Sequence, residues 1–207
     1  MLYFFLCCWS QTSVSESPEP LAIPEEKTQA TPAEEEFIKA SPPVVAIARS
    51  RTLLPITYDP AYFKLKYPMG DPPPNKGVCT DLIVRTYREL GIDLQVLVHE
   101  DMQKRFEDYP KIWGLKKPDP NIDHRRVPNL QTFFDAYAQR YPTDNVEEFR
   151  PGNIVIWKLP TGQFHIGIVS DQKIHSTPKI IHNIGAGPRE EGGLFSWKIV
   201  RNYSYPI

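Results

Sequence analysis

Cysteine is nearly absent from this chain. Only three of its 207 residues are cysteines, and two of them, Cys7 and Cys8, stand in the first ten positions. A folded part that contains Cys79 alone has no intramolecular disulfide to stabilise it. A lone cysteine is usually a small buried hydrophobic residue, but one that opens a helix and has a histidine partner can be a nucleophile. Cys79 is therefore either a packing residue or a reactive one.

The sequence also lacks an excess of charge of either sign and a long apolar run. Its 24 basic and 25 acidic side chains give a net charge of −1, and no basic run alternates with aromatic residues. We therefore do not expect nucleic acid as a partner. A membrane-spanning helix needs about 20 apolar residues, and the apolar stretch at the N-terminus is much shorter than that. We therefore expect no membrane-spanning segment.

A metal-binding motif is also missing. Residues 99–101 read His-Glu-Asp, and three neighbouring side chains on one helix cannot converge on a single ion. A metal hydrolase that uses His124, His165 and His182 is an alternative, but their spacing is not that of an HExxH motif. The sequence predicts neither a metal nor a cofactor.

The prolines are unevenly distributed and mark a domain boundary. Six of the 22 prolines lie between residues 18 and 43, in a segment rich in Glu, Ser, Thr and Ala. Such a segment buries too little apolar surface to offset its ordering entropy, so residues 10–43 are predicted to be a disordered linker. Residues 44–207 are predicted to form one domain, because about 160 residues can bury roughly 70% of their unfolded surface.

Residues 1–9 differ from this linker because they are mostly apolar. They resemble the end of the hydrophobic region of a signal peptide, and Cys7 or Cys8 after Leu6 resembles a lipoprotein cleavage site. The alternatives are a start position set too late and an apolar N-terminus without a targeting role. An export signal before an acidic, proline-rich spacer predicts a periplasmic or cell-envelope protein, anchored to the membrane through its N-terminus in the lipoprotein case.

The hydrophobic pattern predicts helices first and strands afterwards. Helices are expected at residues 44–51, 79–90, 96–109 and 130–141. Strands are expected at residues 151–159, 163–170, 179–184 and 196–205. Gly91 suits the end of the second helix, and Asn129 suits the start of the fourth. This order favours an α+β fold in which N-terminal helices pack on an antiparallel sheet.

Cys79 and His165 occupy positions that suit a thiol nucleophile and its base. A helix N-terminus and a neighbouring imidazolium both lower the pKa of a thiol, so we expect a depressed pKa for Cys79. The helix start also offers backbone N–H groups to an oxyanion. His165 begins a strand after the turn at residues 160–162, where its side chain can reach a cleft. A third polar group would orient His165, and His182 is the candidate, with Asn183 as its rival.

Four segments, in one order, resemble the NlpC/P60 family of papain-like cysteine hydrolases. In that family a cysteine opens a helix of the pattern D-C-S-G-L-V-x-x-x-Y-x-x-x-G-I, and residues 78–92 read VCTDLIVRTYRELGI. Strands of the patterns P-G-D-L-V-F-F, H-V-G-I-Y and I-H-A follow there. Here PGNIVIW, HIGIV and IHN begin at Pro151, His165 and Ile181. An upstream Y-x-x-G-G is similar to YPMGD, which begins at Tyr67.

The chain resembles a narrower family within that superfamily, DUF1287, even more closely. GVCTDLIVRTYRELGIDL, PDPNIDHRRVPNL, HIGIVSD and HNIGAGP are similar to its signatures and extend over nearly the whole domain. The resemblance implies a papain-like fold and an envelope hydrolase of amide bonds, with Cys79, His165 and His182 as catalytic residues. Thr80 and Asp81 replace the Ser-Gly of the broader family. A carboxylate in the first turn is better suited to stabilise the helix N-terminus than to do chemistry.

The implied substrate is the peptide stem of peptidoglycan. Such stems carry several carboxylates, and arginine is suited to binding them. His124, Arg125 and Arg126 are therefore candidates for substrate binding, with an ordinary loop salt bridge as the alternative. Tyr67 is a candidate oxyanion donor or a packing residue. Acyl transfer to an amine and a non-catalytic peptidoglycan-binding module remain alternative functions, and the sequence leaves open which bond is cut and whose cell wall is attacked.

Overall fold

The part of the chain that the structure describes, residues 41–205 of a computed structural model, begins with helix α2. The predicted segment 1–9 and nearly all of the predicted linker 10–43 lie outside these residues. Helix α2 spans Pro43–Ser50, so it begins one residue before the predicted domain boundary. Proline is well placed in the first turn of a helix, because the N–H group that it lacks would have no partner there.

Helices dominate the first half of the described residues. After α2 come α3 (Cys79–Glu89), α4 (Leu94–Lys104) and α5 (Val127–Tyr137), with short 3-10 turns η1 (Arg51–Leu53), η2 (Phe106–Asp108), η3 (Asp123–Arg125) and η4 (Val146–Glu148). The four predicted helices exist, but the third ends at Lys104 and not at residue 109, and the fourth ends at Tyr137, so that the last residues predicted for it include the short strand Gln139–Arg140. The predicted cap at Asn129 is wrong, because α5 begins two residues earlier and the Asn129 side chain donates to the Asp123 carbonyl at 3.1 Å.

The second half forms an antiparallel sheet. Its strands are β3 (Gln139–Arg140), β4 (Ile154–Lys158), β5 (Phe164–Ile174), β6 (Thr177–Asn183), β7 (Pro188–Glu191) and β8 (Lys198–Ser204), in the order β3-β8-β4-β5-β6-β7. The four predicted strands correspond to β4, β5, β6 and β8. The two edge strands, β3 and β7, are short and carry no alternating apolar pattern, so the sequence did not reveal them.

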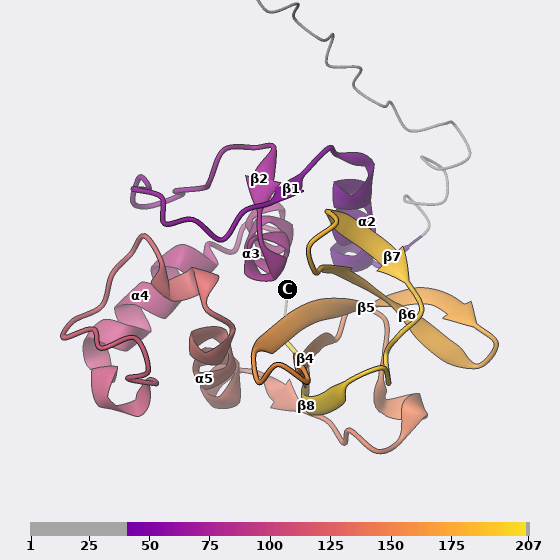
Figure 1. The fold of residues 1–207 in the computed structure, drawn as a ribbon. Coiled ribbons are helices and arrows are strands. Elements are labelled where there is room, and N and C mark those ends of the chain that lie inside the picture. The colour runs from indigo at the N-terminus through magenta and orange to yellow at the C-terminus, as the bar shows by residue number, and fades with distance from the viewer. Residues whose placement is uncertain (1–40, 206–207) are drawn as a thin grey trace, which may run out of the picture.

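Helix α3 is the centre of the molecule. Figure 1 shows it between α4 and the sheet, with α2 and α5 on either side. A small parallel pair, β1 (Thr57–Tyr58) and β2 (Lys76–Gly77), leads directly into it. The protein is therefore a mixed α/β domain in which the helix that begins at Cys79 packs against an antiparallel sheet.

The sheet is apolar on both faces. Ile166 and Ile168 of β5 belong to the larger core, which they share with α3 and α5. Val169 of the same strand belongs to a smaller core on the opposite face, with Trp157 of β4 and Leu194. Alternate residues of a strand point to opposite faces, so the two faces of β5 pack against different cores.

Candidate active site

Cys79 is the first residue of α3, and its burial is nearly complete. Only 6% of the residue is exposed. The preceding residue, Val78, has an extended backbone, and its N–H donates to Asp81 Oδ2 at 2.7 Å. This contact anchors the helix start, as expected for Asp81. The backbone N–H of Ile166 on β5 faces the Cys79 sulfur, so the helix N-terminus and the sheet meet at the thiol.

Two histidines and a glutamate form a hydrogen-bonded chain across three neighbouring strands. His165 Nε2 lies 2.7 Å from His182 Nδ1, and His182 Nε2 lies 3.0 Å from Glu191 Oε1. The residues come from β5, β6 and β7, which pair in this order. Both imidazoles are buried, with 2% and 1% exposed. Sequence reasoning missed Glu191 because it did not detect the strand that carries it.

The carboxylate of Glu191 determines which nitrogen donates and which accepts in the hydrogen bonds of both histidines. An ionised carboxylate only accepts, so we assign the proton to Nε2 of His182. The Nδ1 of a neutral His182 is then an acceptor, and His165 Nε2–H donates to it. The Nδ1 of a neutral His165 therefore carries a free lone pair, which is what a general base requires.

A glycine makes room for this arrangement. Gly167 pairs with His182 across β5 and β6. A Cβ atom at Gly167 would lie 3.0 Å from the Cβ of His182 and 3.2 Å from Cζ3 of Trp157. The His165 ring stacks on Trp157, with ring centroids 5.7 Å apart and an interplanar angle of 27°. The absence of a side chain at Gly167 thus lets both histidines pack against the tryptophan.

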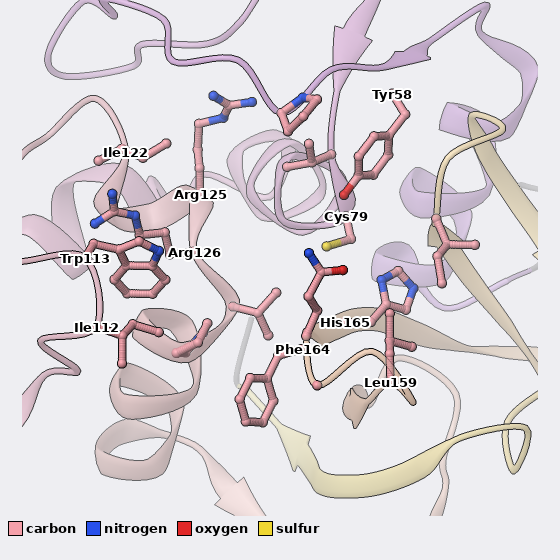
Figure 2. A pocket seen from close by; sticks show the side chains of 17 residues that line it. Tyr58, Cys79, Ile112, Trp113, Ile122, Arg125, Arg126, Leu159, Phe164 and His165 are labelled. Atoms are coloured by element: carbon pink, nitrogen blue, oxygen red, sulfur yellow. The ribbon is translucent and has the colours of Figure 1, made fainter.

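Cys79 and His165 line the same pocket, which has a volume of about 670 Å³. Figure 2 shows both side chains at one end of it, with the Tyr58 hydroxyl pointing toward the Cys79 sulfur. Trp113 and Arg126 lie at the other end (Figure 2). A molecule with its reacting bond at Cys79 therefore has room in the pocket for several more atoms beside that bond.

Burial keeps the thiol and the imidazole neutral. It raises the pKa of Cys79 to about 12, although the backbone N–H groups of Ile166, Thr80 and Cys79 itself act in the opposite direction. Burial, and to a smaller degree the neighbouring His182, also lower the pKa of His165 to about 3. The predicted depression of the Cys79 pKa is therefore wrong, because desolvation outweighs the helix N-terminus.

Arg125 and His124 are internal. Two bonds join Arg125 to Asp81: Nε to Oδ1 at 2.9 Å and Nη2 to Oδ2 at 3.0 Å. The same guanidinium donates to the Ala61 carbonyl at 2.8 Å. His124 is 1% exposed and does not line the pocket, and burial lowers its pKa to about 3. The structure thus supports the loop salt bridge for Arg125.

Tyr67 and Asn183 lie apart from the histidine chain. The Tyr67 ring packs on His99 with centroids 5.2 Å apart, and it does not line the pocket, where Tyr58 is found instead. The Asn183 side chain donates to the Gly77 carbonyl at 3.3 Å. His182, and not its neighbour, is therefore the residue that contacts His165.

Two kinds of feature are absent from residues 41–205. No helix among them is long and apolar enough to cross a membrane. Within the same residues, no three or more metal-binding side chains come together, so the alternative set of His124, His165 and His182 does not converge.

The molecule is thus a mixed α/β domain in which a cysteine at a helix start shares a pocket with one of two hydrogen-bonded, buried histidines. Residues 45–205 match the family described as "Domain of unknown function (DUF1287)", and the chain belongs to this family. It is also similar to a protein of Escherichia coli (strain K12) called "Uncharacterized protein YijF". The two are 48% identical over an alignment of 180 positions, which covers 80% of this chain and 88% of that protein. The resemblance to DUF1287 is thereby confirmed.

Proposed function

We propose that the protein is a cysteine amidase or peptidase of the cell envelope, which cleaves an amide bond in peptidoglycan stem peptides through a thioester on Cys79. One observation carries this proposal. The only free cysteine of residues 41–205 shares a pocket with His165, and His165 ends a hydrogen-bonded chain that leaves its Nδ1 free to accept a proton. A cysteine that served only for packing would need neither the pocket nor the oriented imidazole.

The first half of the reaction forms the thioester. The Cys79 sulfur attacks the amide carbon while His165 Nδ1 takes the thiol proton, because both groups are neutral before substrate binds. The carbonyl oxygen becomes an oxyanion. His165 then gives its proton to the leaving nitrogen, the C–N bond breaks, and an amine departs.

The second half restores the enzyme. Water attacks the thioester carbon while His165 Nδ1 accepts a proton from it. The C–S bond then breaks, a carboxylic acid leaves, and the sulfur recovers its proton from His165. An amine in place of water would complete an acyl transfer with the same residues, so transfer remains the second candidate activity.

Donors for the oxyanion are available beside the sulfur. Cys79 is the first residue of α3, so its backbone N–H has no partner within the helix. The Tyr58 hydroxyl points to the same place (Figure 2). Burial, and to a smaller degree the charge of Asp81, raise the pKa of Tyr58, which keeps this hydroxyl protonated and able to donate. We assign the oxyanion to these two donors.

His182 and Glu191 stabilise the state in which both ring nitrogens of His165 carry a proton. When His165 carries a proton on Nδ1, its Nε2–H still donates to His182, which in turn donates to Glu191. The positive charge on His165 is thus connected to a carboxylate through one imidazole. This is the orienting role of the third residue of a catalytic triad, shared between two side chains.

The test is digestion of purified muropeptides by the full-length protein, with mass spectrometry of the products. Hydrolysis adds one water to the cleaved peptide, and added amine reveals transfer. The Cys79→Ala variant should release no product. Cleavage by that variant at the wild-type rate would exclude the thiol mechanism, and binding without cleavage by the wild-type protein would favour a non-catalytic module.

A further inference from the structure

Arg126 has a guanidinium with no ion-pair partner among residues 41–205. It lines the same pocket as Cys79, and its Nη1 is buried without a hydrogen-bond partner among residues 41–205. Its guanidinium carbon lies over the Trp113 ring, 4.1 Å from the ring centroid.

The other arginines near α3 show how unusual this is. Arg125 pairs with Asp81, and Arg85 pairs with Asp71 at 2.9 Å. Arg51 and Arg88 also have one unpaired buried nitrogen, but each forms an ion pair through the rest of its guanidinium. Arg126 alone among these five lacks a carboxylate partner in the described residues.

A buried donor without an acceptor is unfavourable, and proteins retain few of them. Burial lowers the pKa of Arg126, which means that its charge is incompletely compensated, even though Asp123 and Asp119 act on it from a distance. Its position over the Trp113 ring restricts the guanidinium, and no carboxylate among residues 41–205 forms an ion pair with it. A planar fork held in this way matches the two oxygens of a carboxylate.

We propose that Arg126, held against Trp113, binds a carboxylate of the substrate while the scissile amide lies at Cys79. The proposal rests on the proposed function and deepens it. The preferred substrates are peptides with a free carboxylate near the cleaved bond, and the same peptides with that group amidated are poor substrates. Ile112 and Phe164, which line the same pocket, give the intervening part of the peptide an apolar surface.

Binding can be measured separately from turnover in the full-length Cys79→Ala variant. The probes are stem peptides of one sequence in which each carboxylate, one at a time, is free or amidated, and calorimetry gives each Kd. We expect one amidation to weaken binding by about 10- to 100-fold, since hydrogen bonds to charged groups are the stronger ones. Adding Arg126→Gln should weaken binding of the free acid by a similar factor and remove the difference between acid and amide.

Two control variants test whether the preference for a free carboxylate depends on the Arg126 guanidinium itself or on any change of a surface arginine or of charge. Arg150 also lies over an aromatic ring, that of Tyr141 at 4.9 Å, but it does not line the pocket. Arg150→Gln should therefore leave the preference for the acid intact. Arg126→Lys keeps the charge but loses the fork, so it should retain only part of the preference. Melting temperatures establish that each variant is folded.

The outcomes distinguish this proposal from the proposed function. If the wild-type protein cleaves acid and amide forms equally, or Arg126→Gln keeps the preference, the carboxylate site is wrong and the hydrolase stands. If the acid is preferred through Arg126 but never cleaved, the site stands and the hydrolase is wrong. If none of the peptides is bound or cleaved, both are wrong.

Discussion

Glu191 Oε1 lies 3.0 Å from Nε2 of His182, on the other side of that ring from His165. This contact decides which nitrogen of each histidine carries a proton. Without it, His182 could hold its proton on Nδ1, and His165 would then have to turn its free lone pair toward His182 instead of the thiol. A partly exposed glutamate on an edge strand thus determines which nitrogen of His165 has a free lone pair.

Glu191→Ala is predicted to lower kcat on muropeptides by about 10- to 100-fold, the usual range for a residue that orients another. KM should change little, because Glu191 does not line the pocket. Glu191→Gln should be milder, since an amide oxygen still accepts from Nε2. Glu190 is the matched control: it bonds to Arg49 and Ser170, so Glu190→Gln should lower the melting temperature without lowering kcat. Equal effects of the two substitutions on kcat would contradict the orienting role.

Substitutions of Cys79, His165 and His182 should reduce turnover to different degrees. Cys79→Ala removes the group that forms the thioester and should abolish turnover. His165→Ala should be nearly as severe, because the nucleophile loses its base. His182→Ala should retain more activity, since a misoriented imidazole is still correctly placed part of the time. Rates of product release from muropeptides measure all three.

Asn183 provides the comparison for His182. Its side chain bonds to the Gly77 carbonyl at the start of α3. Asn183→Ala should therefore reduce stability rather than orient the base incorrectly. A kcat below that of His182→Ala, at equal melting temperature, would show that the third residue had been assigned to the wrong neighbour.

The alkylation of Cys79 should be slow at neutral pH and should accelerate with pH. Burial raises the thiol pKa to about 12, above that of a free cysteine, so the thiolate fraction at pH 7 is lower than in an unfolded peptide. The rate should rise about tenfold for each pH unit between pH 6 and 9, as expected well below a pKa. Iodoacetamide labelling, with peptide mapping to separate Cys79 from Cys7 and Cys8, gives the profile.

His165→Ala is the control for this profile. If the thiol is neutral at rest, the variant should show the same slope as the wild-type protein. A plateau below pH 8 in the wild type that disappears in His165→Ala would instead reveal a thiolate–imidazolium pair, and the neutral resting state would then be wrong.

The pair of Asp81 and Arg125 is predicted to be structural. Both side chains are nearly inaccessible, with 2% and 1% exposed. Asp81→Asn leaves a buried guanidinium without its counter-charge and should reduce the free energy of unfolding by about 3–5 kcal/mol. Urea denaturation measures it. The exposed pair of Arg105 and Asp108 is the control, and Asp108→Asn should cost about 0–1 kcal/mol. Equal losses in the two variants would contradict a structural role for Asp81.

The order of the helices and strands, and the pairing of Cys79 with His165, could be predicted from the amino-acid sequence. A broken, proline-rich segment followed by apolar residues at three- and four-residue steps predicts a helix that begins at Cys79, and strict alternation predicts the strand that carries His165. Both signals are local, because helical and strand periods are properties of neighbouring residues. The resemblance to DUF1287 followed from such local segments as well.

The protonation state and the neighbours of Cys79 and His165 follow from tertiary contacts instead. The pKa of Cys79 depends on burial, which the sequence does not report. The Arg125 guanidinium forms an ion pair with Asp81, which lies 44 positions away in the sequence, whereas Nη1 of the neighbouring Arg126 has no hydrogen-bond partner among residues 41–205. Tyr58 stands at the sulfur in place of Tyr67, and Glu191 reaches His182 because β7 pairs with β6. Each of these depends on contacts between distant segments, and such contacts form only when the sheet closes against α3.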